Sequence, residues 1–247
     1  MAQKKRYGFV IDISRCIDCR ACLVSCSVEN GVGMKYTRIW VRDLGVQGQF
    51  PGLRQAFVPY NCMHCEQPPC TEVCVSGATY KDKETGLVLI DQEACIGCGF
   101  CVDACPYNAR YLDRERGVAD KCTGCIQRLQ VNQAPACVAT CVGGARMFGD
   151  LNDPASEVSQ ALLNAKAVQR LDYEKNGVHT EPNIYFVNGE VLQEASLLPR
   201  DPHYTPAQEA WKQVLVPAAL AGLGLSVAAQ AGYFTKQLVE GEKEFEE

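Results

Sequence analysis

Sixteen cysteines constrain this 247-residue chain more than any other feature, because they fall into four groups of four. The first and third groups share the spacing C-x2-C-x2-C-x3-C, and the other two also begin with C-x2-C. In chain order the groups are Cys16, Cys19, Cys22 and Cys26; Cys62, Cys65, Cys70 and Cys74; Cys95, Cys98, Cys101 and Cys105; and Cys122, Cys125, Cys137 and Cys141. No cysteine is left over, so the fold has to use four complete quartets of thiols.

The third group, followed by Pro106, has the spacing of the bacterial ferredoxins. A cubane needs four thiolates that converge on it from different sides. Three cysteines on a loop wrapped round the cluster supply three of them, and a helix that begins near the third carries the fourth away. In two-cluster ferredoxins that fourth cysteine binds the other cluster. The sequence therefore predicts iron–sulfur chemistry, and sixteen thiolates divided by four predict four 4Fe-4S clusters.

Two other uses of cysteine are weaker interpretations. C-x2-C pairs also build zinc ribbons, but a triple repeated in two groups suits a cubane better than one tetrahedral ion. Disulfide frameworks are typical of small secreted domains. This chain is longer than such domains, and its polar start, Met1–Tyr7, does not resemble a secretory signal.

Composition and motifs exclude several functions. The formal net charge is −5, and no basic stripe interleaved with aromatic residues indicates a nucleic-acid partner. We find no glycine loop for phosphate and no convincing nucleophile–base pair. The expectation is a non-catalytic electron-transfer protein, without catalytic residues of its own.

The cysteine groups and their neighbours resemble the iron–sulfur (beta) subunits of the molybdopterin oxidoreductase, or dimethyl sulfoxide reductase, superfamily. This superfamily includes polysulfide, thiosulfate and tetrathionate reductases and respiratory formate dehydrogenases. The resemblance covers roughly Tyr7 to Pro154 and rests on Cys16–Cys22, Cys62–Cys70, Cys98–Tyr107, Lys121–Cys125 and Phe148–Pro154. One mild departure is that Ser27, Val75 and Val142, rather than proline, follow the last cysteines of three groups.

The resemblance implies that distant groups share clusters. The implied sets are Cys16, Cys19, Cys22 and Cys141; Cys122, Cys125, Cys137 and Cys26; Cys62, Cys65, Cys70 and Cys105; and Cys95, Cys98, Cys101 and Cys74. It also implies an α+β fold of two interleaved ferredoxin-like modules, the second at about 55–115 inserted in the first.

The resemblance further implies a role in a membrane-bound respiratory oxidoreductase. The chain would relay electrons through four 4Fe-4S clusters, between a molybdopterin-type catalytic subunit and a quinone-interacting integral membrane subunit. An alternative is the iron–sulfur subunit of a hydrogenase-linked or other quinone reductase complex.

Hydrophobic patterns predict the remaining organisation. β-branched and aromatic runs predict strands at 7–13, 39–42, 55–58, 87–90 and 183–187, and a helical period predicts a helix over 155–169. The expected divisions are a four-cluster domain at 1–154, an extension and linker at 155–210, a membrane helix at 211–236 and an acidic tail at 237–247.

The segment Val214–Phe234 has no formal charge and is long enough to span a bilayer. Trp211 and Lys212 flank one end, and Tyr233 and Lys236 the other, as interfacial anchors do. Small residues at Ala218, Gly222 and Ser226 suit packing against another membrane helix. A buried helix of a soluble protein is the alternative. With the membrane helix we expect the cluster domain on the periplasmic side.

Several polar residues lie near the cysteines in sequence. His64 has four cysteines around it, so a supporting or surface position is expected rather than metal ligation. Arg20, Arg110, Lys121 and Arg128 either raise cluster potentials or are ordinary surface charges, and the sequence leaves both open.

Overall fold

The computed structural model describes residues 4–175, 178–189 and 214–244. The chain divides into two compact units, Met1–His203 and Tyr204–Glu247. The first unit holds all sixteen cysteines, each as a free thiol. Residues 190–210 of the expected extension and linker lie outside the described residues.

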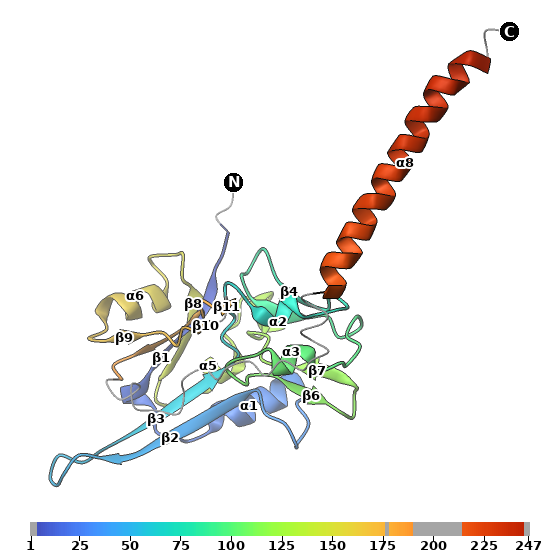
Figure 1. Ribbon diagram of the computed structural model, residues 1–247. Helices are drawn as coiled ribbons and strands as arrows, with labels where there is room; N and C mark the ends of the chain where they lie inside the picture. The colour runs from blue at the N-terminus through green and yellow to red at the C-terminus, as the bar shows by residue number, and fades with distance from the viewer. Residues whose placement is uncertain (1–3, 176–177, 190–213, 245–247) are drawn as a thin grey trace. The chain divides into compact units, whose positions relative to one another are not determined.

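A four-stranded sheet in the order β8-β1-β12-β9 organises the first unit (Figure 1). Its strands are β1 (Tyr7–Asp12), β8 (Arg146–Asp150), β12 (Ile184–Val187) and β9 (Val168–Gln169). β1 runs antiparallel to β8 and parallel to β12, with Phe9 opposite Ile184. The strands predicted over 7–13 and 183–187 are thereby confirmed as β1 and β12. Their apolar runs fit strands that are paired on both sides.

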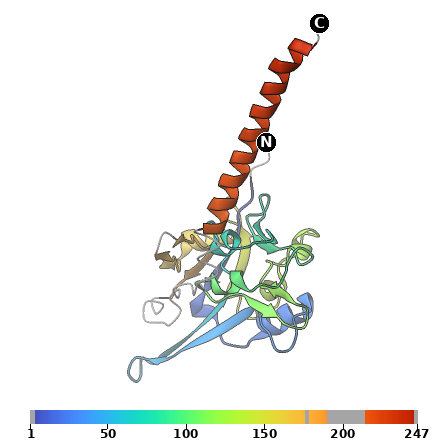
Figure 2. The same ribbon diagram turned by 45° about the vertical axis from the view of Figure 1, so that its right-hand side comes forward.

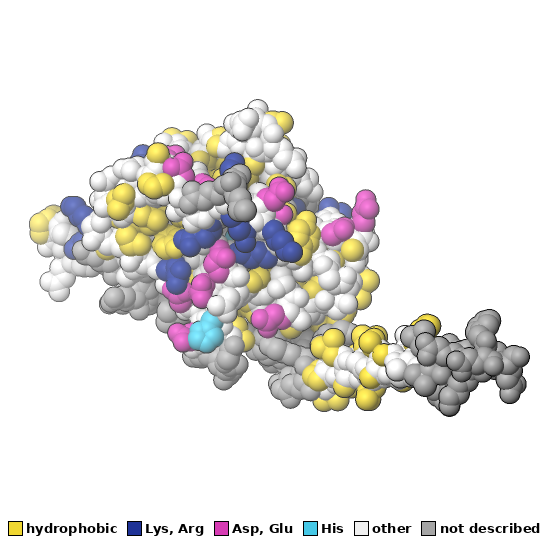
Figure 3. Space-filling view, turned by 90° about the horizontal axis from the view of Figure 1, so that it is seen from above, with side chains coloured by type: hydrophobic (Ala, Val, Ile, Leu, Met, Phe, Trp, Pro, Cys, Tyr) yellow, Lys and Arg dark blue, Asp and Glu magenta, His cyan; other side chains and the backbone are white. Residues whose placement is uncertain are grey.

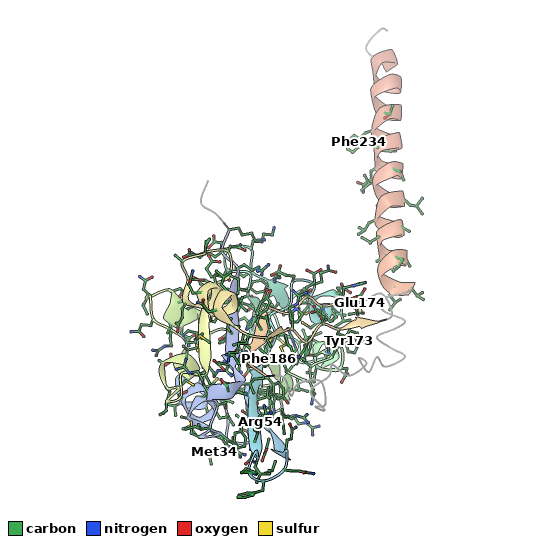
Figure 4. The ribbon with its side chains drawn as sticks, turned by 90° about the vertical axis from the view of Figure 1, so that its left-hand side faces the viewer. Met34, Arg54, Tyr173, Glu174, Phe186 and Phe234 are labelled. Atoms are coloured by element: carbon green, nitrogen blue, oxygen red, sulfur yellow. The ribbon has the colours of Figure 1, made fainter. Side chains whose placement is uncertain are left out.

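Successive residues of the sheet face two different apolar layers, as the two-residue period of a strand requires. Phe9, Ile11 and Phe186 are buried in the core shared with the cysteines, and Phe186 lies inside the domain in Figure 4. Val10 and Val187 are buried on the opposite side with Met147 and Val158. The sheet therefore separates the cysteine region from a smaller second core.

The helix that covers this second core is α6 (Glu157–Asn164). It begins where the Ser156 hydroxyl accepts a hydrogen bond from the backbone N–H of Ser159 at 3.3 Å. The expected apolar face is confirmed, because Val158 is fully buried. The expected length is wrong: the chain becomes extended at Ala165 and then forms β9, which pairs with β12.

A long hairpin of β2 (Ile39–Gln47) and β3 (Arg54–Asn61) extends away from the rest of the first unit (Figures 1 and 2). It is longer than the two short strands expected. The strands continue past a bulge between Asp43 and Val46, where Gly45 takes a φ of 75°. Its tip carries Phe50, which is exposed.

Short helices and two-stranded pairs make up much of the rest of the first unit (Figure 1). The helices are η1 (Ile13–Arg15), α1 (Ala21–Asn30), α2 (Pro69–Glu72), α3 (Phe100–Asp103), α4 (Ile126–Leu129) and α5 (Ala136–Ala139). The two-stranded pairs are β4 (Thr79–Lys81) with β5 (Val88–Ile90), β6 (Tyr111–Asp113) with β7 (Val118–Asp120), and β10 (Glu174–Lys175) with β11 (Val178–His179). β5 confirms the strand expected over 87–90. The whole is a mixed α and β fold, as predicted.

The second unit contains one long helix, α8 (Val216–Glu244). Its stretch Pro217–Thr235 is long and apolar enough to cross a membrane, and none of it is buried in the chain. In Figure 3 several hydrophobic side chains lie along the coloured part of this helix, with white atoms between them. The predicted apolar segment is therefore helical, and the helix continues beyond the predicted end.

Candidate iron–sulfur sites

Two cysteine loops share an unusual local geometry. Asp18 and Arg20, on either side of the second cysteine of the first group, have φ values of 51° and 56°. Gly97 and Gly99 occupy the matching positions of the third group, with φ values of 66° and 81°. Left-handed residues at these points curl the loop so that its thiols share one side. A helix, α1 or α3, follows each loop directly.

The structure brings cysteines from different groups together. Four spatial sets, called I to IV, collect cysteines whose thiols act on one another electrostatically, and interactions such as Cys22 with Cys137 and Cys122 with Cys62 also link neighbouring sets. Set I is Cys16, Cys19, Cys22 and Cys141; set II is Cys26, Cys122, Cys125 and Cys137; set III is Cys62, Cys65, Cys70 and Cys105; and set IV is Cys74, Cys95, Cys98 and Cys101. Each set takes three thiols from one sequence group and one from another.

Set I surrounds a small hollow whose walls include all four of its cysteines. Burial raises the pKa of the Cys16 thiol, and the nearby thiols of Cys141 and Cys19 raise it further. Burial also raises the pKa of Cys22 to about 11, against an opposing effect of Arg146. These thiols are therefore close enough to repel one another when ionised.

In set II, one side-chain amide contacts two of the four thiols. The Asn30 side chain, on the last turn of α1, places its Nδ2 3.7 Å from the Sγ of both Cys26 and Cys125. Burial raises the pKa of Cys26 to about 12, and the thiols of Cys137 and Cys125 add to this. Helix α1 thus carries Cys26 away from its own sequence group and into set II.

Sets III and IV show the same crossover. Burial raises the pKa of Cys65 well above its usual value, and Cys62, Cys70 and Cys105 raise it further. In set IV, burial raises the pKa of Cys98, the backbone N–H of Phe100 opposes this, and its three partner thiols raise it again.

Backbone N–H groups also point at several thiols. Thr79 N lies 3.2 Å from Cys74 Sγ, Ala119 N 3.4 Å from Cys95 Sγ, Gly124 N 3.4 Å from Cys122 Sγ, and Ala109 N 3.5 Å from Cys105 Sγ. Such donors favour the thiolate over the thiol, and thiolates are the form that binds metal.

The sets lie next to one another in the order I, II, III, IV. Arg146 is acted on by Cys22 of set I and by Cys137 of set II. Cys122 of set II is acted on by Cys62 of set III. Sets III and IV meet at Arg110, where thiols of both sets act on the guanidinium: Cys70, Cys101, Cys62 and Cys105.

The cysteines are most exposed to solvent at the two ends of this order and least exposed in the middle. All four cysteines of set II and three of the four in set III are buried. Sets I and IV each have one exposed cysteine, Cys19 and Cys98 respectively. Exposed apolar side chains lie beside both ends, with Ile17 and Val142 next to set I cysteines and Ile96 next to set IV cysteines.

Three buried cations lie among these sets: Arg110, Lys121 and Arg146, each at most 3% exposed. None of them forms an ion pair with a carboxylate of the described residues. The guanidinium atoms Nε and Nη2 of Arg110, and Nε and Nη1 of Arg146, are buried without a hydrogen-bond partner. Since an isolated buried charge is strongly unfavourable, this region is built to receive an anionic group.

The donor set fits an iron–sulfur cluster. Four thiolates bound to iron carry negative charge, which complements the three buried cations. Within the described part of the chain, no three Cys, His, Asp or Glu side chains are close enough to hold a single metal ion.

The structure separates the polar residues that the sequence left open. Arg20 is exposed and pairs with Asp18 at 3.1 Å, and Arg128 pairs with Glu29 at 2.8 Å, so both are peripheral charges. His64 is buried, and its Nδ1 accepts a hydrogen bond from the backbone N–H of Val88 at 3.1 Å. The buried imidazole therefore supports the loop of the second cysteine group from within the core.

Sequence reasoning missed two contributors. Arg146 lies on β8, beyond the last cysteine group, and donates a hydrogen bond to Oδ1 of Asn61. The Nδ2 of Asn61 in turn lies 3.5 Å from Cys122 Sγ. Only the pairing of β8 with β1 places Arg146 beside the thiols, and no local motif signals it.

Comparison with known proteins agrees with this chemistry. The sequence matches the 4Fe-4S dicluster domain family over residues 53–151 and the 4Fe-4S binding domain family over residues 13–31. A tetrathionate reductase subunit of Salmonella typhimurium is 38% identical over 212 residues, which are 85% of this chain and 82% of that protein. The tetrathionate reductase subunit of the same name in Archaeoglobus fulgidus is 43% identical over 188 residues, or 76% and 84%. A protein of Halobacterium salinarum, named as a dimethyl sulfoxide reductase iron–sulfur subunit, is 38% identical over 216 residues, or 75% and 80%.

Proposed function

As the chain belongs to the family of iron–sulfur (beta) subunits of the molybdopterin oxidoreductases, we propose that it relays electrons between a molybdopterin-type catalytic subunit and a quinone-interacting membrane subunit. It is an electron-transfer subunit and not the catalytic one. The names of its relatives favour this role over the alternative of a hydrogenase-linked complex.

The observation that carries the proposal is the row of four thiol sets with exposed ends. We assign the four cysteines of each set as the ligands of one 4Fe-4S cluster, in two ferredoxin-like modules of which one is inserted in the other. When bound, such a cluster accepts or releases a single electron. The buried cysteines of sets II and III exclude water from the middle of the row, while Cys19 and Cys98 mark the two ends.

The two ends suit contact with partner redox centres. Electron transfer without bond formation requires donor and acceptor to approach closely, which only sets I and IV allow. Exposed apolar residues around them, Ile17 and Val142 at one end and Ile96 at the other, are typical of protein contact surfaces. We propose that each end faces a different subunit.

The first test is the iron and acid-labile sulfide content of the anaerobically purified complex, with zinc measured in the same samples. About 16 of each per chain are expected, as four cubanes require. A content near 12 or below, with zinc making up the deficit, would refute the four-cluster relay.

The helix α8 is proposed to fasten the chain beside the membrane subunit. Its stretch Pro217–Thr235 supports this by length and composition, and its small residues Ala218, Gly222 and Ser226 suit close packing with another helix. A chain shortened before residue 214 is expected to leave the membrane fraction while keeping its iron. Retention of the shortened chain in membranes stripped of the partner subunit would contradict the anchor.

We propose that the cluster domain lies on the periplasmic side, exported together with a signal-bearing partner, and that the acidic tail lies inside. Reporter fusions after Glu247 test this. A reporter that is active only in the cytoplasm is expected to work there, and one that needs export is expected to be silent. The reverse result would place the cluster domain in the cytoplasm.

A further inference from the structure

Three positive charges alternate with the four thiol sets. Arg146 is acted on by thiols of sets I and II, and it also lines the hollow of set I. Lys121 is acted on by Cys62 and Cys70 of set III and by Cys122 of set II. Arg110 is acted on by thiols of sets III and IV. Each junction between neighbouring sets thus contains one cation.

These cations are held in place by neutral groups. The Nη1 of Arg110 donates to Thr79 Oγ1 at 3.2 Å, and the Nζ of Lys121 donates to the backbone oxygen of Cys122 at 2.7 Å. Neither contact neutralises charge. The buried Arg38 is different because its charge is paired with the Asp120 carboxylate. Its Nε donates to Asp120 Oδ2 at 3.0 Å, and its Nη2 donates to Asp120 Oδ1 at 2.7 Å.

We propose that Arg146, Lys121 and Arg110 act as positioning charges, each of which raises the reduction potentials of the two clusters on either side of it. The inference rests on the proposed four-cluster relay. A fixed positive charge favours the more negative, reduced form of a cluster, and low solvent exposure strengthens that effect. Because sets II and III each lie beside two of these cations and sets I and IV beside one, the middle potentials are raised more than the end potentials.

The structure predicts which clusters respond to which residue. Replacing Arg146 lowers the potentials of sets I and II, replacing Lys121 those of sets II and III, and replacing Arg110 those of sets III and IV. Sets II and III therefore respond to two cations each, whereas the end sets respond to one. A general loss of packing would not produce this overlapping pattern.

The test uses the purified complex and titrates each cluster by EPR at controlled potential. Signals are assigned with variants that remove one ligand of one set. Arg146→Gln and Arg110→Gln are expected to shift the oxidised-to-reduced ratio of each adjacent cluster about tenfold, which is about 59 mV for one electron. Arg146→Lys and Arg110→Lys keep the charge and are expected to restore the potentials.

Arg128→Gln is the matched control, because Arg128 follows Cys125 closely in sequence but is paired with Glu29 and partly exposed. It is expected to leave all four potentials unchanged. Iron and sulfide per chain are measured for every variant. If a glutamine variant loses a cluster but the lysine variant keeps it, the result supports a role for the positive charge. Loss of the cluster in both variants overturns the proposal.

Equal shifts of all four clusters, or no shift, would overturn the inference. A wild-type complex with four clusters and unshifted variants refutes the shared-charge role alone. A wild-type complex with fewer than four clusters refutes the relay as well, and the shared-charge role with it.

Discussion

Replacement of Cys26 by serine tests the crossover between sequence groups most directly. Cys26 belongs to the first group in sequence, but in the structure it lies in set II, beside Cys125 and Cys137. It is 5% exposed, so solvent does not readily replace a lost ligand. We expect Cys26→Ser to damage the cluster of set II and to spare that of set I.

The magnitude follows from the division of the thiols. One of four clusters holds about a quarter of the iron, so iron falls from about 16 to about 12 atoms per chain, with sulfide in proportion. Set II lies between sets I and III, so its loss separates set I from the other two. Each isolated end remains reducible by small dyes, while electron transfer along the whole row of clusters is lost.

The assay combines iron and sulfide analysis with EPR of the complex during reduction. Ser27→Ala, which changes the next residue of the same helix, is the control and is expected to keep all clusters. If Cys26→Ser instead removed only the signal of the cluster held by Cys16, Cys19 and Cys22, the crossover assignment would be wrong.

Three further predictions follow from burial. An iron chelator added under mild oxidation is expected to remove iron in two phases, the first of which releases about 8 of the 16 atoms. The reason is that only sets I and IV expose a cysteine, Cys19 or Cys98. A single phase in an iron-release time course would contradict this. Asp120→Asn is expected to destabilise the fold by about 3–5 kcal/mol, because it leaves the charge of Arg38, which is 6% exposed, without its partner. Chemical denaturation of the protein with intact clusters measures this free energy. A loss below about 1 kcal/mol would mean that the ion pair is effectively solvated. Phe186→Ala is expected to cost about 3–5 kcal/mol in the same measurement, since this side chain is 1% exposed, and a negligible change would mean that β12 is not part of the stable core.

The cysteine quartets were predictable because their chemistry is local. Loop spacing, the start of α1 and α3 directly after the cysteine loops, and the strands β1 and β12 all follow from short stretches of sequence. The number of clusters follows from counting. Which thiols share a cluster is different, because it depends on helices that carry a cysteine across the fold, and only the family resemblance suggested it.

The environments of the buried cations could not be predicted from the sequence. Arg110 and Arg128 looked alike in the sequence, since Arg110 closely follows the third cysteine group and Arg128 lies within the fourth. In the structure one is enclosed by thiols and the other pairs with Glu29. That difference comes from tertiary packing, as does the position of Arg146, whose strand is held beside β1 by long-range pairing. No local pattern records such environments.

The position of β1 in the sheet also sets an order of events during synthesis. β1 is made first, but one of its two neighbours, β12, lies at Ile184–Val187, beyond every cysteine of the chain. On the ribosome, all sixteen thiols are therefore present while one side of β1 is still unpaired. Pairing of β1 with β12 joins strands that are far apart in the sequence, and contacts of this kind form slowly.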